Sequence, residues 1–195
     1  EVIKREAPKD VDFVACGSAS KRFAPTDELE IGEIAGQLDS IGIPDTSPLK
    51  KDTLVHGSGY VIQSDTEWVI GSTYEQKPWS SGAASEFNIE KNRKFLGNSP
   101  VHSRSNFRAQ RCVSSDRDPV IGELNKGQYF STAHGSMGTI SSPFAAEIVV
   151  SQFLGLLLPL SKSGLATVAP DRFQKRQKKR GVKRIGESSY TEVIP

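Results

Sequence analysis

The segment from Gly127 to Leu158 constrains the fold of this chain more than any other. Residues 129–133 have the length and β-propensity of a short strand, and Gly135 and Gly138 allow the backbone to turn tightly after it. The Ser142-Pro143 pair matches the N-cap and the first position of a helix. The segment therefore predicts a strand, a glycine turn and a helix whose positive end suits an anion or a cofactor, with a purely structural turn as the alternative.

The rest of the chain adds a second kind of pattern. Val11 to Cys16 reads as a buried parallel strand, whereas the middle of the chain reads as antiparallel. A short helix is predicted to begin at Ser85 or Asn88 and to end at Leu96. The antiparallel elements are expected at Glu30 to Leu38, at a hairpin made of Thr53 to Gln63 and Trp68 to Tyr74, and at Arg104 to Val113. The predicted class is α+β, with an antiparallel-rich sheet inserted between two pieces of a parallel layer.

Composition excludes several classes of protein. The chain has 195 residues and a net charge of +2, but its basic residues crowd into the last part of the sequence. The longest apolar run, Ile148 to Leu160, is interrupted by polar residues and is shorter than the roughly 20 residues that span a bilayer. Cys16 and Cys112 are far apart in apolar surroundings, so we expect reduced, buried thiols, a cytoplasmic protein and no membrane association. The three histidines have no metal-site spacing with them, and no metal site is predicted.

One extended motif resembles a known family. The motif is Arg111-x-x-Ser114-x-Asp116-x-x-Pro119-x-Ile121-Gly122, followed by a strand, by Ala133-His134-Gly135-Ser136-Met137-Gly138-Thr139 and by a helix. It resembles the FAD-dependent D-amino-acid oxidase superfamily, which includes glycine and sarcosine oxidases. Within that superfamily the chain is most similar to the oxidoreductase half of bifunctional enzymes that modify the wobble uridine of tRNA, because Leu158-Pro159-Leu160 and Pro170-Asp171-Arg172-Phe173 resemble their tail.

The resemblance implies a fold and an activity. An antiparallel-rich substrate domain, residues 28–113, would be inserted in the C-terminal part of a Rossmann-like FAD-binding layer formed by residues 1–27 and 114–160, with a basic C-terminal tail over residues 161–195. The implied enzyme uses FAD to oxidise the carboxymethylaminomethyl group of the tRNA wobble uridine and leaves aminomethyl-uridine. Its partners would be tRNA and FAD, with a methyltransferase domain fused in the parent chain.

Two departures from the family pattern affect these expectations. The Gly-x-Gly-x-x-Gly fingerprint that holds the cofactor pyrophosphate does not occur in the sequence. We therefore expect a fragment that lacks the N-terminal half of the cofactor layer, binds little FAD by itself and is inactive alone. The related tRNA enzymes also usually carry Gly-Ser-Arg-Gly where this chain has Gly135-Ser136-Met137-Gly138.

The resemblance also suggests site residues. Arg111 would pair with the substrate carboxylate through its planar guanidinium, with Arg104 and Arg108 on the same strand as competitors. Tyr60 and Tyr74 would contact the substrate base, whereas Trp68 is expected to be a core residue. The cofactor would contact His134, Gly135, Ser136, Met137, Gly138 and Thr139. The tRNA phosphates would contact Arg172, Lys175, Arg176, Lys178, Lys179 and Arg180.

Other functions remain open at this point. An oxidase of a small free amine such as glycine or sarcosine would share the Arg111 motif, and the basic tail argues against it. A non-catalytic tRNA-binding module would explain the missing fingerprint, Met137 and the basic tail together. A solvated basic terminus that binds nothing and an exposed strand arginine are the structural alternatives for the tail and for Arg111.

Overall fold

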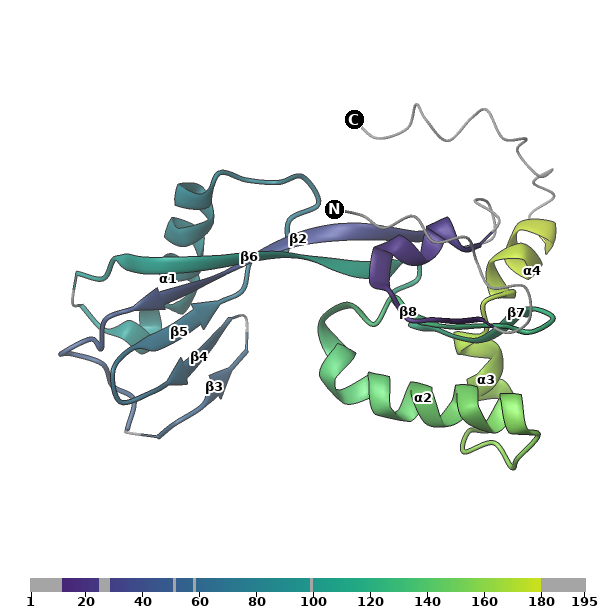
Figure 1. Cartoon of the computed structure of the whole chain (residues 1–195). Coiled ribbons are helices and arrows are strands. Elements are labelled where there is room, and N and C mark those ends of the chain that lie inside the picture. Colours follow the sequence, from purple (N-terminus) through teal and green to yellow (C-terminus); the bar gives the residue numbers. More distant parts are fainter. Residues whose placement is uncertain (1–11, 25–28, 51, 58, 99, 180–195) are drawn as a thin grey trace. The chain divides into compact units, whose positions relative to one another are not determined.

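The structure, a computed structural model, describes residues 12–24, 29–50, 52–57, 59–98 and 100–179. The chain divides into two compact units (Figure 1). The first unit comprises Glu1–Glu33 and Arg111–Pro195, and the second comprises Ile34–Gln110. Two long strands, β2 (Ile31–Ile41) and β6 (Ser103–Ser114), carry the chain from one unit to the other and back.

The first unit contains a mixed three-stranded sheet in the order β1-β8-β7. Strand β1 (Asp12–Val14) pairs in parallel with β8 (Gln128–Thr132), which pairs antiparallel with β7 (Val120–Asn125). Phe13 lies opposite Tyr129 in this register. The parallel pairing predicted near the start of the chain is therefore confirmed, with β8 as its neighbour among the described residues. The prediction that this strand is buried is wrong, because Phe13 is 54% exposed.

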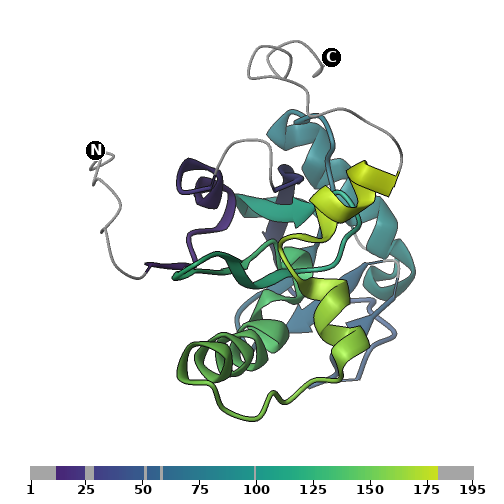
Figure 2. The same ribbon diagram turned by 90° about the vertical axis from the view of Figure 1, so that its right-hand side faces the viewer.

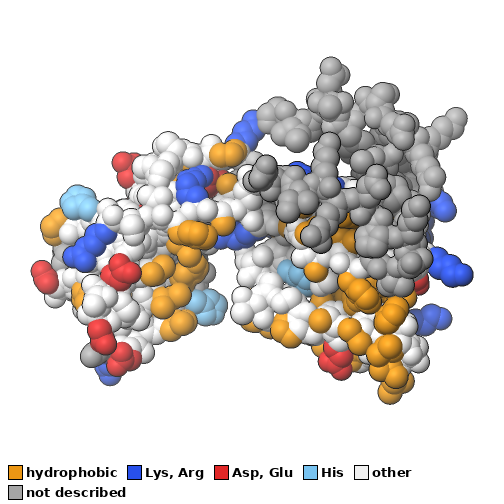
Figure 3. Space-filling model, in the orientation of Figure 1, with side chains coloured by type: hydrophobic (Ala, Val, Ile, Leu, Met, Phe, Trp, Pro, Cys, Tyr) orange, Lys and Arg blue, Asp and Glu red, His pale blue; other side chains and the backbone are white. Residues whose placement is uncertain are grey.

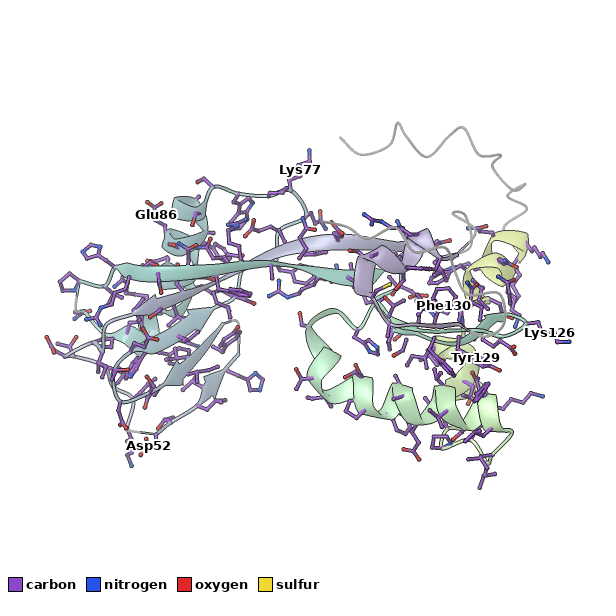
Figure 4. All side chains as sticks on the ribbon, in the orientation of Figure 1. Asp52, Lys77, Glu86, Lys126, Tyr129 and Phe130 are labelled. Atoms are coloured by element: carbon purple, nitrogen blue, oxygen red, sulfur yellow. The ribbon has the colours of Figure 1, made fainter. Side chains whose placement is uncertain are left out.

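Two hydrophobic cores cover the two faces of this sheet. On one face, Tyr129 packs with α2 (Gly138–Leu154) and near α3 (Lys162–Val168). Figure 2 shows α2 viewed along its axis. Phe130 points to the opposite face and packs with Phe173 of α4 (Arg172–Lys179) (Figure 4). Successive strand residues alternate in this way because their side chains point to opposite faces of a pleated sheet.

The helix after the glycine turn begins earlier than the sequence predicts. A short 3-10 helix, η2 (Gly135–Met137), leads directly into α2 at Gly138, so the prediction of a start at Ser142-Pro143 is wrong. Pro143 lies inside the helix, where it has no N–H to donate to the carbonyl four residues earlier and its ring crowds that carbonyl. The positive end of the helix dipole consequently lies at the glycine turn itself.

The segment after α2 differs from the packed connector that its leucines suggest. Leu156 and Leu157 are 57% and 96% exposed, and Figure 3 shows hydrophobic side chains gathered over this end of α2. In contrast, part of the basic segment is folded: α3 and α4 both lie within it, and Phe173 is fully buried. Burial of one aromatic side chain thus holds α4 against the sheet.

The second unit is built on a five-stranded sheet in the order β3-β4-β5-β2-β6. Strands β3 (Val55–His56), β4 (Tyr60–Gln63) and β5 (Trp68–Gly71) pair antiparallel, and the hairpin predicted to turn between Ser64 and Glu67 is confirmed. Helix α1 (Ser81–Leu96) packs on β4 and β5 and is longer than predicted. It begins at Ser81 because the Ser80 hydroxyl accepts a hydrogen bond from the Ala83 amide as its N-cap.

These features confirm the predicted fold class, a mixed structure with an antiparallel-rich sheet. Both cysteines are free thiols. The prediction of buried thiols is wrong for Cys16, which is exposed, and Cys112 is only half-buried. Within the described ranges no helix combines the length and the apolar character that crossing a membrane requires.

Candidate functional site

Two turns lie together at the carboxyl ends of the parallel strands of the first unit. Gly17 starts the 3-10 helix η1 (Gly17–Arg22) after β1, and Ala133 to Met137 follow β8. The Thr132 hydroxyl donates a 2.9 Å hydrogen bond to the Gly17 carbonyl and joins the turns. Gly17, Ala133 and Gly135 have φ values of 59°, 58° and 56°, a conformation that brings backbone groups to the surface of a turn. The carboxyl end of parallel strands is where α/β sheets bind ligands.

The end of β6 lies against both turns. A Cβ added at Gly17 would lie 3.8 Å from the Cβ of Cys112, and one added at Gly135 would lie 3.5 Å from Cγ1 of Val113. Val113 also forms an antiparallel bridge with His134. Arg111 directly precedes these two residues, is half-buried and already has a partner within the structure. Arg111 therefore lies two residues before Val113, the β6 residue that contacts the turn predicted to hold the cofactor.

His134 connects the strand to the helix across the turn. Its Nε2 lies 3.1 Å from the Ser131 hydroxyl, and its Nδ1 lies 2.8 Å from the Ser141 hydroxyl, which in turn donates to the Met137 carbonyl. Burial lowers the pKa of the imidazole below its usual value of 6.5. A neutral ring donates one hydrogen bond and accepts one, which matches its two hydroxyl neighbours. His134 thus braces the glycine turn from within.

Only some backbone amides of this turn are available to a ligand. The Met137 N–H donates to the His134 carbonyl at 3.1 Å, so it closes the 3-10 turn instead. The Met137 side chain is 57% exposed and the neighbouring Ile140 is 72% exposed, so an uncharged surface follows the turn. Ser136, Gly138 and Thr139 lie at the helix start, where N–H groups point toward solvent or a ligand.

Arg108, one competitor of Arg111, is already engaged in the second unit. Its Nη2 lies 2.7 Å from the fully buried Glu75 carboxylate, and its Nη1 donates a 2.8 Å hydrogen bond to Oε1 of Gln37. Burial raises the pKa of Glu75, but hydrogen bonds from Thr73, the Trp79 amide and Arg108 more than offset it, so the net pKa is lowered. A guanidinium paired with a buried carboxylate is poorly suited to bind a second one.

A second buried carboxylate, Asp39, organises the same unit through hydrogen bonds from neutral side chains. Asp39 accepts hydrogen bonds from the side chains of Gln37, Ser85, Asn88 and Ser103, at 2.5 to 3.3 Å. These groups come from β2, α1 and β6, so the network ties the helix to the sheet beside an apolar cluster that includes Trp68. Such a network is structural, and the prediction that Trp68 is a core residue is confirmed by its 5% exposure.

The candidate substrate tyrosines lie in different environments. Tyr60 is half-buried on β4, whereas Tyr74, in the connection from β5 to α1, is 38% exposed. Two aromatic residues that were not predicted as site residues, Trp79 and Phe87, are 40% and 41% exposed and pack edge to face with ring centroids 5.1 Å apart. The signal that could have located Phe87 is the N-cap at Ser80. A helix from Ser81 to Leu96 buries Ala84 and Asn88 and leaves Phe87 on its outer face.

Three cations of the described part of the basic segment form ion pairs. Arg172 donates to both oxygens of Asp116, and Arg176 pairs with Asp116 and with Glu30. Lys175 pairs with Asp171 at 2.6 Å. Lys178 and Lys179 are exposed at the end of α4, and Arg180 lies outside the described residues. A surface pocket of about 410 Å³ is lined by Ala166, Arg172, Lys175, Arg176 and Lys179.

Comparison with known proteins identifies relatives that are longer than this chain. No protein-family model matches it. A tRNA 5-methylaminomethyl-2-thiouridine biosynthesis bifunctional protein MnmC from Ectopseudomonas mendocina is 26% identical over 219 residues, 90% of this chain and 32% of the relative. The protein of the same name from Idiomarina loihiensis is 26% identical over 155 residues, 75% of this chain and 25% of the relative. The chain thus spans about a third or less of their length.

Two solved structures that share the fold are named as oxidases. Iminodiacetate oxidase from Chelativorans sp. BNC1 matches 85% of this chain and 47% of its own, with a TM-score of 0.68 and 17% identity. Glycine oxidase from Geobacillus kaustophilus matches 83% of this chain and 45% of its own, with a TM-score of 0.63 and 15% identity. The resemblance predicted from the Arg111 and glycine-turn motifs is confirmed: the chain is a homologue, over most of its own length, of the MnmC proteins, and it has the fold of these amine oxidases.

Proposed function

We propose that this chain is part of an FAD-dependent amine oxidoreductase that oxidises the carboxymethylaminomethyl group of the tRNA wobble uridine. The observation that carries the proposal is the joined pair of turns at the carboxyl ends of β1 and β8, immediately beside Arg111. The homology to tRNA biosynthesis proteins over 90% of the chain supports the choice of tRNA as substrate.

The described residues fit one part of such a cofactor. The turn after β8 places the start of α2 at the sheet edge, where N–H groups and the helix dipole favour a developing negative charge. Gly135, with its positive φ, allows a ring system to approach the backbone closely. The fingerprint that binds the cofactor pyrophosphate is not in the sequence. These residues would therefore contact only the redox-active ring of FAD.

The residues of this chain would then divide the work. A bound flavin would supply the acceptor for the hydride from the carbon beside the amine nitrogen, and water would then release the oxidised side arm as glyoxylate. Arg111 would bind the substrate carboxylate and so orient that carbon, because a guanidinium holds a carboxylate in one plane. The amides of Ser136, Gly138 and Thr139 would stabilise charge at the far side of the site, and His134, as a neutral ring, would keep the turn in place.

The complete gene product, expressed with its natural flanking sequence, provides the test. We expect it to purify yellow and to convert tRNA bearing carboxymethylaminomethyl-uridine to aminomethyl-uridine, which nucleoside mass spectrometry detects. Arg111→Met should lower kcat/KM by about a hundredfold or more, since it removes a charged bidentate contact. Lys126→Gln, an exposed change in the β7–β8 turn, is the matched control and should leave kcat/KM unchanged. A colourless protein that takes up no FAD would refute the proposal.

A second candidate is an oxidase of a small free amine. The specific observation in its favour is that Arg172 and Arg176, two cations of the predicted tRNA site, are already neutralised by Asp116 and Glu30. Comparing turnover of free glycine or sarcosine with turnover of modified tRNA separates the two functions. Flavin binding with tRNA affinity but no turnover of either substrate would instead favour a non-catalytic tRNA-binding module.

A further inference from the structure

An aromatic pair is displayed on the outer face of the second unit. Trp79, just before α1, and Phe87, within it, lie with their ring centroids 5.1 Å apart and their planes at 73°. Each side chain is about 40% exposed, as the sixteen-residue helix turns its buried residues toward the sheet and Phe87 away from it. Adjacent exposed aromatic rings form a contiguous apolar patch, and such patches mark binding sites on protein surfaces.

The pair is held in place by buried hydrogen bonds. The fully buried Glu75 carboxylate accepts a 2.8 Å hydrogen bond from the Trp79 amide, a second from Thr73 and the charged contact of Arg108. The N-cap at Ser80 then fixes the first turn of the helix that carries Phe87. Because the backbone on both sides of Trp79 is fixed in this way, little backbone conformational entropy remains to be lost when a ligand stacks on the ring.

The surroundings of the pair are basic. Lys91 lies one helical turn after Phe87, with its Nζ 5.3 Å from the ring centroid and donating a 3.4 Å hydrogen bond to the Ser72 carbonyl. Lys94 follows on the same face by helical spacing, with its Nζ 4.6 Å from the centroid of the Phe95 ring. Lys77 projects from the connection before Trp79 (Figure 4). Between residues 76 and 98 four basic side chains, Lys77, Lys91, Arg93 and Lys94, outnumber the two carboxylates of Glu86 and Glu90, and Glu90 already pairs with Arg93 at 3.8 Å.

We propose that this Trp79–Phe87 platform stacks an unpaired base of single-stranded RNA while Lys91 and Lys94 contact the adjoining phosphates. Aromatic rings interleaved with lysines match that partner, because each base offers a π-face and each nucleotide carries one negative charge. An apolar protein segment would not use the cations. The inference deepens the proposed function, since a wobble uridine lies in an unpaired loop, but it requires no flavin and no Arg111.

Equilibrium binding of this chain to a short RNA hairpin with an unpaired loop tests the platform. Trp79→Ala should weaken binding by about fivefold to a hundredfold, the range of one lost stacking contact. Trp79→Phe should retain most of the affinity. Lys91→Gln should weaken binding at low salt and reduce the slope of log K against log salt by about 1. The matched control is Phe107→Ala on β6, whose ring is 67% exposed and which should not change the affinity.

Fluorescence gives a readout that a structural role of Trp79 would not produce. The chain has two tryptophans, and Trp68 is buried, so quenching by stacked bases reports on Trp79. We expect quenching by the loop RNA, none in Trp79→Phe, and little by a fully paired duplex.

Several results would overturn the platform: unaltered affinity of Trp79→Ala, equal binding of loop and duplex, or no RNA binding. Shielding of Trp79 from a soluble quencher in the complete gene product without RNA would assign the surface to a protein contact. If the complete gene product oxidises the amine and its Trp79→Ala variant binds RNA with normal affinity, the proposed function stands and this inference fails. If RNA stacks on Trp79 but no oxidation occurs, this inference stands and the proposed function fails.

Discussion

Arg172 donates two hydrogen bonds of 2.9 Å to the carboxylate of Asp116, one to each oxygen. The pair joins the C-terminal helix α4 to the turn between β6 and β7, and the Arg172 side chain is only 10% exposed. Its guanidinium also lies 4.2 Å from the centroid of the buried Phe173 ring. Asp116 accepts hydrogen bonds from Ser114 and from the Asp118 amide within its own turn, and it also anchors α4.

Asp116→Asn should destabilise the first unit by about 2 kcal/mol, because it leaves a largely buried guanidinium without its charged partner. Urea unfolding followed by circular dichroism measures the change as a shift in midpoint. Lys175→Gln, which breaks the exposed pair with Asp171, is the control and should change stability by less than about 0.5 kcal/mol. Equal effects of the two variants would contradict the anchoring role.

The same pair predicts an acid-dependent loss of stability. Burial alone would raise the pKa of Asp116, but hydrogen bonds from Arg172 and Ser114 and the nearby cations lower it from 3.8 to about 2. Because the folded pKa is the lower one, the stabilisation is complete above pH 4 and is lost as the pH falls toward 2. Comparing unfolding midpoints of the wild type and Asp116→Asn should show their difference shrinking across that window. A constant difference would show that Asp116 does not titrate as described.

His134 predicts a separate effect at higher pH. Its lowered folded pKa means that the unfolded chain binds a proton more readily, so stability should be full above pH 6.5 and should fall as the pH drops through the folded pKa. His134→Asn should remove this dependence, since it cannot be protonated. Thermal unfolding of both proteins between pH 5 and 8 measures it, and an identical pH profile in the two would count against the neutral bridge between Ser131 and Ser141.

Phe173→Ala should destabilise the protein by about 3 to 5 kcal/mol, the usual cost of emptying a core aromatic site. Phe173 is fully buried among Val14, Val120 and Phe130. Leu157→Ala is the matched control because Leu157 is 96% exposed, and it should leave the free energy of unfolding nearly unchanged. If both variants unfold at the same denaturant concentration, α4 is not part of the folded unit.

Asp39→Asn should destabilise the second unit by about 2 kcal/mol, because one of its oxygens becomes a donor facing the hydroxyls and amides that now donate to it. Fluorescence of the buried Trp68 follows unfolding of this unit. Glu86→Gln on the exposed face of α1 is the control and should have no measurable effect. Unchanged stability of Asp39→Asn would show that the network tolerates a neutral acceptor.

The sequence predicted which segments meet at the site, but not which of its side chains are already engaged elsewhere. The strand and glycine turn around His134 and the end of β6 after Arg111 do come together, as the family resemblance implied. The roles of the single site residues remain predictions. Arg108 could not be removed as a competitor from sequence, because its partner Glu75 is 33 residues away along the chain. Pairing over such distances is decided by strand register, which a local pattern does not specify.

Local chemistry by itself determined the order of elements, the parallel strand, the hairpin and the antiparallel-rich middle, because these follow from hydrophobic periodicity and turn residues. Tertiary structure alone decided three further points. The helix α2 starts at Gly138 because the turn continues into it directly, despite the cap signal at Ser142. Helix α4, in the described part of the basic segment, packs onto the sheet because Phe173 is buried and Asp116 pairs with Arg172. Trp79, rather than Trp68, is the exposed tryptophan because the register of β5 turns Trp68 toward α1. Each of these depends on contacts between residues distant in sequence, whose energies outweigh local propensity.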